Sequence, residues 1–297
     1  MQSIQYYIAH LDLDCFFCQV HSIANNIPSS QPLVVQQQYD IISVNYPARD
    51  LDIYKHQSPK EIKTRHPNVT IAQAHWTGAK VSYQPYRSAS YAIFTLVKES
   101  VQKQSTIPVH FERTSIDEGY LIFQFQSDQS SQPHSSNGNN SETDSNSDEE
   151  QQIQTQDEEN EYVAVIDKII HKVRKDVFQA LGFHISAGIG PTKLLAKLAS
   201  KDAKPNNQTS LTLKEYFEDC AHMTLGDLPM FSRKVDQTLK QNGIGKYSSE
   251  GAAREWSTVV NISIPPSSFK PVSLALSRIS SILKHPNKSF FNPIKYI

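Results

Sequence analysis

The sequence has little cysteine and no long apolar segment. Only three of its 297 residues are cysteine, an odd number that offers no disulfide framework. No segment approaches the roughly 18 apolar residues of a membrane span, and no apolar segment of a secretion signal follows Met1. Cys15 and Cys18 form a C-x-x-C pair, but no second pair follows at zinc spacing, which favours buried thiols. These absences predict a soluble, intracellular protein without a membrane partner.

The chain also lacks a net positive charge, because 29 lysine and arginine residues are balanced by 30 acidic residues, which gives a net charge of −1. Residues 124–161, however, contain ten acidic residues and no lysine or arginine. Removing those ten charges leaves the rest of the chain at +9. A body of that charge attracts phosphate groups, although a solvated basic surface without a partner is an equally open interpretation. The segment 124–161 has almost no large apolar residues, so we expect it to be disordered.

Carboxylates lie at the ends of predicted strands. The stretch "FERTSIDEGYLIF" places Asp117 and Glu118 at the turn of a predicted hairpin, and "YYIAHLDLD" predicts a buried strand that ends at Asp12 and Asp14. Alternate residues of a strand share a face, so Asp12 and Asp14 are expected to point the same way. Carboxylate oxygens suit magnesium, and two metal ions promote phosphoryl transfer. The pattern therefore predicts a metal site for phosphoryl chemistry, with exposed or capping carboxylates as the alternative.

The remaining periodicity predicts alternating helices and strands. Apolar residues at helical spacing predict helices over 15–24, 86–103 and 163–181, and one that Pro191 begins. Strands are expected over 41–44, 69–73, 109–113, 119–125 and 184–190. This order favours an α/β (α+β) fold with a ferredoxin-like layer. From Leu211 onward the sequence predicts a separate small helical unit.

Basic side chains cluster in two places. Tyr46 and Arg49 lie close to Lys55 and Lys60, and the first two could clasp a polyphosphate, because arginine offers a planar fork of donors. Further along, lysines recur at spacings of four, four and three at positions 193, 197, 201 and 204. That stripe fits either a bound phosphate backbone or a solvated helix face.

Four motifs carry a resemblance to a known family. The segments "HLDLDCFFCQV", "VNYPAR", "RTSIDEGYL" and "SAGIGPTKLLAKLASKDAKPNNQT" resemble, in order and spacing, those of Y-family translesion DNA polymerases, most of all the eta branch. The resemblance covers roughly residues 8–209. It implies a palm over 1–24 and 68–204, interrupted by the acidic insertion, fingers over 25–67 and a helical thumb over 205–262. Residues 263–297 would be a linker and the start of a little-finger domain, so we expect a fragment or a truncated form.

The resemblance also implies roles for individual residues. Those that match metal-binding or catalytic positions are Asp12, Asp117 and Glu118, together with the main-chain carbonyl of Leu13. Those that match contacts to the triphosphate are Cys15, Phe16, Tyr46, Arg49 and Lys204. Phe17 matches the aromatic gate against a 2′-hydroxyl, and Gln36 and Lys55 match residues over the nascent base pair. His21 departs from the family, which has glutamate near the metals at this position.

The function implied is DNA-directed DNA synthesis across lesions, in which a primer 3′-hydroxyl attacks a bound deoxynucleoside triphosphate. The implied cofactor is two Mg²⁺ ions, with Mn²⁺ as a substitute. The implied partners are primer–template DNA and dNTP, with a sliding clamp left open, and the implied location is the nucleus. A catalytically impaired paralogue or DNA-binding regulator is the main alternative, and a palm-type nucleotidyl cyclase is a weaker one.

Overall fold

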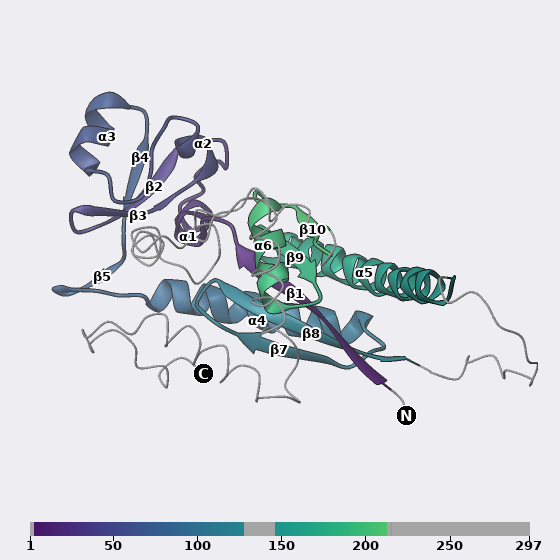
Figure 1. The fold of residues 1–297 in the computed structure, drawn as a ribbon. Coiled ribbons are helices and arrows are strands. Elements are labelled where there is room, and N and C mark those ends of the chain that lie inside the picture. Colours follow the sequence, from purple (N-terminus) through teal and green to yellow (C-terminus); the bar gives the residue numbers. More distant parts are fainter. Residues whose placement is uncertain (1–2, 128–145, 213–214, 216–297) are drawn as a thin grey trace, which may run out of the picture. The chain divides into compact units, whose positions relative to one another are not determined.

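The computed structural model describes residues 3–127, 146–212 and 215 (Figure 1). These residues belong to one unit of the chain. The expected thumb therefore lies outside the described residues apart from its first few positions, and the expected linker and little-finger start lie wholly outside them.

A five-stranded sheet forms the larger layer of this unit. Its order is β10-β9-β1-β8-β7, with β1 (Ser3–Leu13) in the centre. β1 pairs antiparallel with β8 (Glu118–Ser127) on one side and with β9 (Ile185–Gly190) on the other. β7 (Val109–Arg113) and β10 (Gln208–Ser210) complete the sheet. The strands expected from alternation are confirmed, whereas the three-residue β10 is too short to show an alternating pattern and was not predicted.

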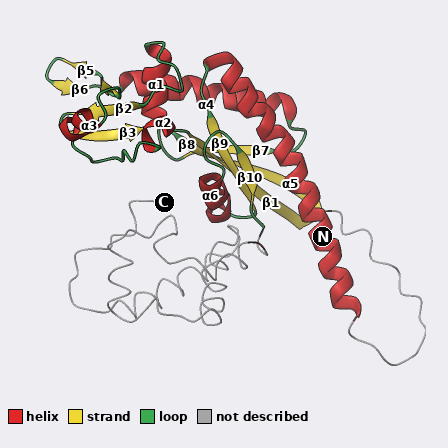
Figure 2. Cartoon of the chain, turned by 90° about the horizontal axis from the view of Figure 1, so that it is seen from above, coloured by secondary structure: helices red, strands yellow, loops and turns green. Residues whose placement is uncertain are grey.

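Helices cover both faces of this sheet (Figure 2). Residues of β1 such as Leu11 belong to a core shared with α4 (Gln84–Gln104) and α5 (Asn146–Leu181). Ile8, which points to the opposite face, packs against Ala196 of α6 (Lys193–Asp202). The even-numbered residues of β1, Asp12 among them, therefore lie on the α6 face.

A smaller three-stranded sheet has a core of its own. Its order is β3-β2-β4, formed by β2 (Leu33–Gln37), β3 (Asp40–Val44) and β4 (Thr70–Gln73). Two short helices, α2 (Tyr46–Arg49) and α3 (Pro59–Arg65), accompany it. Its buried residues come from β2, β3 and the loops and helices around them: Val34, Ile41, Val44, Ala48, Ile53, Ile62 and Val69.

The remaining elements lie on either side of this small sheet in the sequence. α1 (Phe16–Ala24) precedes it. The hairpin of β5 (Trp76–Thr77) and β6 (Lys80–Val81) follows it and leads to α4.

Two sequence predictions are corrected. Disorder was expected over 124–161, but β8 continues to Ser127 because Phe123 and Phe125 are buried in the pairing with β1. α5 begins at Asn146, where a run of glutamate and glutamine provides strong helix formers. Residues 128–145 lie outside the described residues.

The start of α6 is the second correction. This helix begins at Lys193 and not at Pro191, because the Thr192 hydroxyl caps it by accepting the Leu195 N–H at 3.2 Å.

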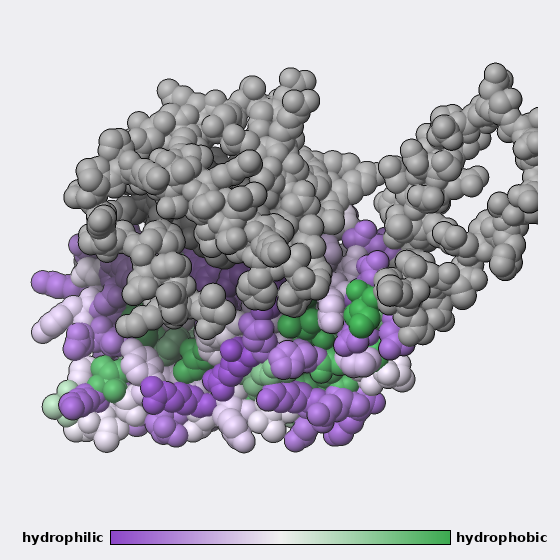
Figure 3. All heavy atoms as spheres, turned by 60° about the horizontal axis from the view of Figure 1, so that its bottom comes forward, coloured by the Kyte–Doolittle hydropathy of each residue, from purple (hydrophilic) through white to green (hydrophobic). Residues whose placement is uncertain are grey.

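Figure 3 shows a face on which hydrophobic residues lie in small groups among hydrophilic ones. In the part of the chain that the structure describes, no helix is both long and apolar enough to cross a bilayer.

The contact between α6 and β9 is close enough to require glycine. A Cβ added at Gly188 would lie 2.1 Å from the carbonyl oxygen of Ala196 and 2.1 Å from the backbone nitrogen of Ser200. Both neighbours are helix backbone, which cannot rotate aside. Gly188 therefore sets how near α6 approaches the centre of the sheet.

We expect Gly188→Ala to lower the free energy of unfolding by about 3 kcal/mol or more, because α6 must shift away from β9. Urea denaturation measures the change. The matched control is Gly78→Ala, where nothing lies within 4 Å and only the positive φ of 61° opposes alanine, at about 1 kcal/mol. Equal losses in the two variants would contradict this role of Gly188.

Candidate active site

The pairing of β1 with β8 brings the predicted acids to one end of the sheet. Asp12 lies directly opposite Glu118 in the antiparallel register. Directly opposed residues project to the same face, which here is the face covered by α6. The Leu13 N–H donates to the carbonyl oxygen of Asp117 at 2.9 Å, which ties the hairpin turn to the end of β1. The three carboxylates are thus neighbours through the backbone.

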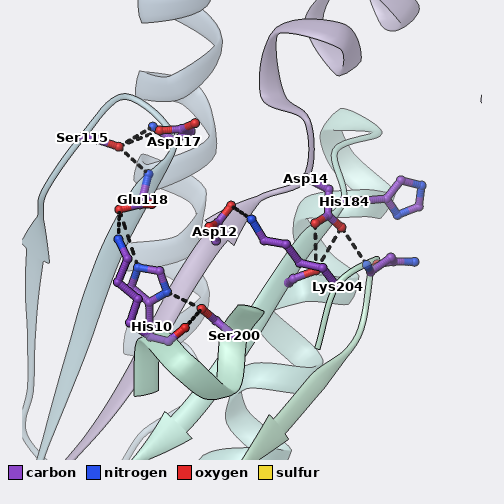
Figure 4. Close-up of polar contacts among 12 residues, drawn as sticks. His10, Asp12, Asp14, Ser115, Asp117, Glu118, His184, Ser200 and Lys204 are labelled. Carbon is purple, nitrogen blue, oxygen red and sulfur yellow. Dashed lines mark hydrogen bonds and ion pairs between the residues drawn. The ribbon is translucent and has the colours of Figure 1, made fainter. Parts of the chain in front are cut away.

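Glu118 is held by two nitrogen-bearing side chains (Figure 4). Lys197 of α6 donates to Glu118 Oε2 at 2.7 Å, and His10 Nε2 lies 3.8 Å from the same oxygen. The second distance is too long for a hydrogen bond, so that contact is electrostatic. His10 and then Lys197 lower the pKa of Glu118 to about 2, against burial, which raises it. Glu118 is therefore a carboxylate throughout the neutral range.

The position of His10 is fixed in turn by Ser200. His10 is fully buried, and its Nδ1 lies 2.6 Å from Ser200 Oγ. The Ser200 hydroxyl also donates to the carbonyl of Lys197 at 2.8 Å, so Ser200 connects His10 to the same turn of α6 that bears Lys197. Neither residue was predicted as part of the site. The available signal was that His10 precedes Asp12 by two residues and so shares its strand face.

Asp12 is paired with Lys204. The ammonium nitrogen lies 2.6 Å from Asp12 Oδ1, and the Asp12 side chain is 15% exposed. Burial raises the pKa of Asp12, and Lys204 counteracts this effect. Lys204, expected to contact a triphosphate, is therefore engaged with an acid in this structure.

Asp117 is turned toward its own hairpin (Figure 4). The Ser115 hydroxyl donates to Asp117 Oδ1 at 2.6 Å. Ser115 Oγ also accepts the N–H groups of Asp117 and Glu118 at 3.1 and 3.0 Å, which stabilises the tight turn.

The side chains of Asp12, Asp117 and Glu118 do not converge on one point in this structure. Within the described ranges no three His, Cys, Asp or Glu side chains are grouped closely enough to ligate an ion. Like charges repel, so each carboxylate pairs with its nearest donor instead. The side chains nevertheless fit a hard cation, because all of them are carboxylates, whose oxygens such cations prefer. Two of these carboxylates already bind a positive charge, the ammonium groups of Lys197 and Lys204.

Asp14 does not join these acids. It follows the last residue of β1, where strand alternation no longer fixes its direction, and it is 3% exposed. It accepts hydrogen bonds from the Ser186 hydroxyl at 2.8 Å, the Tyr46 hydroxyl at 3.1 Å and the Asn206 N–H at 2.6 Å. Asp14 thus links β9, α2 and the segment after α6.

The residues expected at the triphosphate lie beside this link. The Arg49 guanidinium carbon is 4.6 Å from the Tyr46 ring centroid, and Arg49 Nε donates to the Val44 carbonyl at 3.1 Å. Burial raises the pKa of Tyr46, which therefore stays a hydroxyl. Cys15 and Tyr46 both line a cavity of about 260 Å³. Cys15 is the N-cap of α1 at φ 38°, and Phe16 is 2% exposed.

The other expected contacts lie on α1 and the small sheet. The Phe17 ring lies 4.3 Å from the Tyr86 ring, centroid to centroid. Gln36 in β2 accepts from Gln73 at 3.1 Å, and Lys55 is exposed between α2 and α3.

His21, which stands where the family has glutamate near the metals, contacts Tyr86 in this structure. His21 Nε2 lies 2.7 Å from the Tyr86 hydroxyl, because its position on α1 directs the imidazole toward the start of α4.

The lysine stripe pairs mainly with acids across the sheet. Lys193 contacts Glu112 at 2.6 Å, in addition to the contacts of Lys197 with Glu118 and of Lys204 with Asp12. Lys201 is exposed. The stripe is therefore neither simply solvated nor free for a phosphate backbone in this structure.

Comparison with known proteins identifies relatives of the chain. The model of the impB/mucB/samB family matches residues 11–201. DNA polymerase iota of Mus musculus is 28% identical over 243 residues, which cover 80% of this chain and 32% of the mouse protein. DNA polymerase eta of Drosophila melanogaster is 30% identical over 244 residues, which cover 69% of this chain and 27% of the fly protein. The chain thus spans about a third of the length of these relatives.

A solved structure shares the fold. DinB from Sulfolobus solfataricus matches with a TM-score of 0.55 and 20% identity, over 81% of this chain and 58% of that one. The α/β prediction is confirmed by this likeness. The preference for the eta branch stays a prediction, because relatives named iota and eta both match.

The low pKa of Glu118 predicts a pH-dependent contribution to stability. A lowered folded-state pKa stabilises the protein above the ordinary value of 4.5, and this contribution is lost as the pH falls from 4.5 toward 2. We expect wild type to lose about 2 kcal/mol more unfolding free energy than Glu118→Gln between pH 5 and pH 3. Urea denaturation at each pH measures the difference.

The control for the loss of one negative charge is Glu112→Gln, which removes a carboxylate from the exposed pair with Lys193. Equal acid sensitivity of wild type and Glu118→Gln would show that His10 and Lys197 do not act on Glu118 as described.

Proposed function

The chain belongs to the impB/mucB/samB family, the Y-family of translesion DNA polymerases, and we propose that it is the nucleotidyl-transferring part of a DNA-directed DNA polymerase. Template-directed transfer from a dNTP to a primer 3′-hydroxyl, across damaged template bases, is the proposed reaction. The observation that carries the proposal is the register of β1 and β8, which sets Asp12 opposite Glu118 with Asp117 adjacent on the turn. Three carboxylates at one sheet end are what phosphoryl transfer by hard cations requires.

Asp12, Asp117, Glu118 and the carbonyl of Leu13 would hold the divalent metal, for which we propose two Mg²⁺ ions, with Mn²⁺ as a substitute. Such ions lower the pKa of an attacking hydroxyl and neutralise the charge that develops on the phosphates. The protein contributes the ionised state and the position of the acids. His10 and Lys197 keep Glu118 deprotonated, and Ser200 keeps His10 in place.

The nucleotide would lie between the acids and the small sheet. Arg49 and Tyr46, stacked on each other, offer a planar donor group and a hydroxyl to the triphosphate. Lys204 would contribute its charge, and the backbone N–H groups of Cys15 and Phe16 would add donors. Phe17 would lie against the sugar. Gln36 and Lys55 would contact the nascent base pair.

The larger organisation follows the same proposal. Residues 1–24 and 68–204 would form the palm, 25–67 the fingers and 205–262 the thumb, with 263–297 leading into a little finger. Primer–template DNA and dNTP would be the partners, with a sliding clamp bound through other regions. The eukaryotic relatives named iota and eta support a nuclear location, although bacterial proteins named DNA polymerase IV also match. No specific observation favours the regulator or the cyclase.

The direct test is primer extension with magnesium. We expect Asp117→Ala to lower incorporation by at least about 100-fold, because it removes one ligand of the charge-neutralising cation. The control is Asp176→Ala, which removes a carboxylate of α5 that is paired with Lys172 and bonded to Ser100. Full activity in Asp117→Ala would overturn the proposal. Cyclic nucleotide made from triphosphate without DNA would favour the cyclase instead.

A further inference from the structure

His21 and Phe17 contact the same tyrosine from one face of α1. They are four residues apart, so they lie one above the other on the helix. The Phe17 ring is tilted by 54° against the Tyr86 ring at 4.3 Å. The His21 ring lies 5.8 Å from the Tyr86 ring, and its Nε2 is 2.7 Å from the hydroxyl oxygen. The body of Tyr86 therefore supports Phe17 while its polar end is bound to His21.

The protonation states define this hydrogen bond. Burial lowers the pKa of His21, and the proximity of His75 lowers it further. Burial also raises the pKa of Tyr86, so its hydroxyl keeps its proton. The Tyr86 O–H therefore donates to a neutral imidazole.

Tyr86 is held by burial and by its neighbours. It is 1% exposed and is among the largest fully buried side chains of the described residues. Tyr83 packs on it at 6.1 Å and contacts Phe17 at 6.1 Å. Tyr83 is itself anchored, because its hydroxyl donates to Gln37 of the small sheet at 2.5 Å. The ring of Phe17 thus rests on two tyrosines whose hydroxyls are both bound.

We propose that His21 is a positioning residue that sets the sugar selectivity of the nucleotide site. This inference rests on the proposed function, in which Phe17 lies against the sugar of the bound nucleotide. A site can reject a ribose for its extra 2′-hydroxyl only if the side chain against the sugar is rigid. A Phe17 ring that moved aside would make room for the 2′-oxygen. His21 supplies that rigidity through Tyr86. The nucleotides distinguished are deoxyribonucleoside and ribonucleoside triphosphates.

The test is the ratio of the equilibrium affinities of the full chain for dATP and ATP, measured with magnesium. Wild type is expected to prefer dATP, and His21→Ala is expected to reduce that preference at least tenfold. Tyr86→Phe, which keeps the ring and loses the hydroxyl, should reduce it similarly. The double variant should add nothing further, because both changes remove one bond. His21→Gln, whose amide oxygen accepts from Tyr86, should restore most of the preference.

The control is Asn25→Ala. Asn25 donates to the His21 carbonyl at the end of α1, so its loss weakens the helix end without removing the bond to Tyr86. The preference should persist in this variant. An unchanged ratio in His21→Ala, an equal loss in Asn25→Ala, or a wild type without preference overturns the inference.

The outcomes distinguish a failure of the proposed function from a failure of the role of His21. If wild type prefers dATP but does not extend a primer, the polymerase assignment is overturned and the role of His21 stands. If wild type extends a primer and His21→Ala keeps the ratio, only the role of His21 is overturned. A chain that binds neither nucleotide overturns both.

Discussion

Two carboxylates held opposite each other on neighbouring strands are the constraint on which the rest of this structure depends. Asp12 and Glu118 face each other across β1 and β8, and like charges at such positions destabilise a sheet. α6 offsets this repulsion, because Lys197 pairs with Glu118 and the segment after the helix brings Lys204 to Asp12. The close approach of α6 at Gly188 makes these contacts possible. The packing of α6 on the sheet and the neutralisation of the two carboxylates therefore depend on each other.

α1 and the start of α4 connect this centre to the small sheet. Tyr46 of α2 donates to Asp14, next to the end of β1, and Tyr83 donates to Gln37 of β2. Phe17 packs against both Tyr83 and Tyr86. Tyr46, proposed to contact phosphate, is therefore bonded next to the end of β1, and Phe17, proposed to contact the sugar, packs on a tyrosine bonded to the small sheet.

Local pattern predicted most of the fold but not the network behind the acids. Alternation in "YYIAHLDLD" and the motif "RTSIDEGYL" were sufficient to place Asp12 and Glu118 at strand ends. The hydrogen bond between His10 and Ser200 joins residues 190 positions apart, and the spacing of apolar residues along the sequence cannot predict such a distant contact. The contact of His21 with Tyr86 was not predicted either, because a place in a sequence motif does not say which neighbour a side chain meets. The ends of the acidic segment were misjudged because composition does not reveal the pairing of Phe123 and Phe125 with β1.

The most direct test of the account is Mn²⁺ binding followed by electron paramagnetic resonance in the presence of dNTP. The paired carboxylates should bind the ion, and Asp12→Asn should weaken binding at least tenfold, whereas Glu112→Gln, with the same loss of charge, should leave it unchanged. Equal affinity of wild type and Asp12→Asn would contradict the claim that these opposed acids form the metal site.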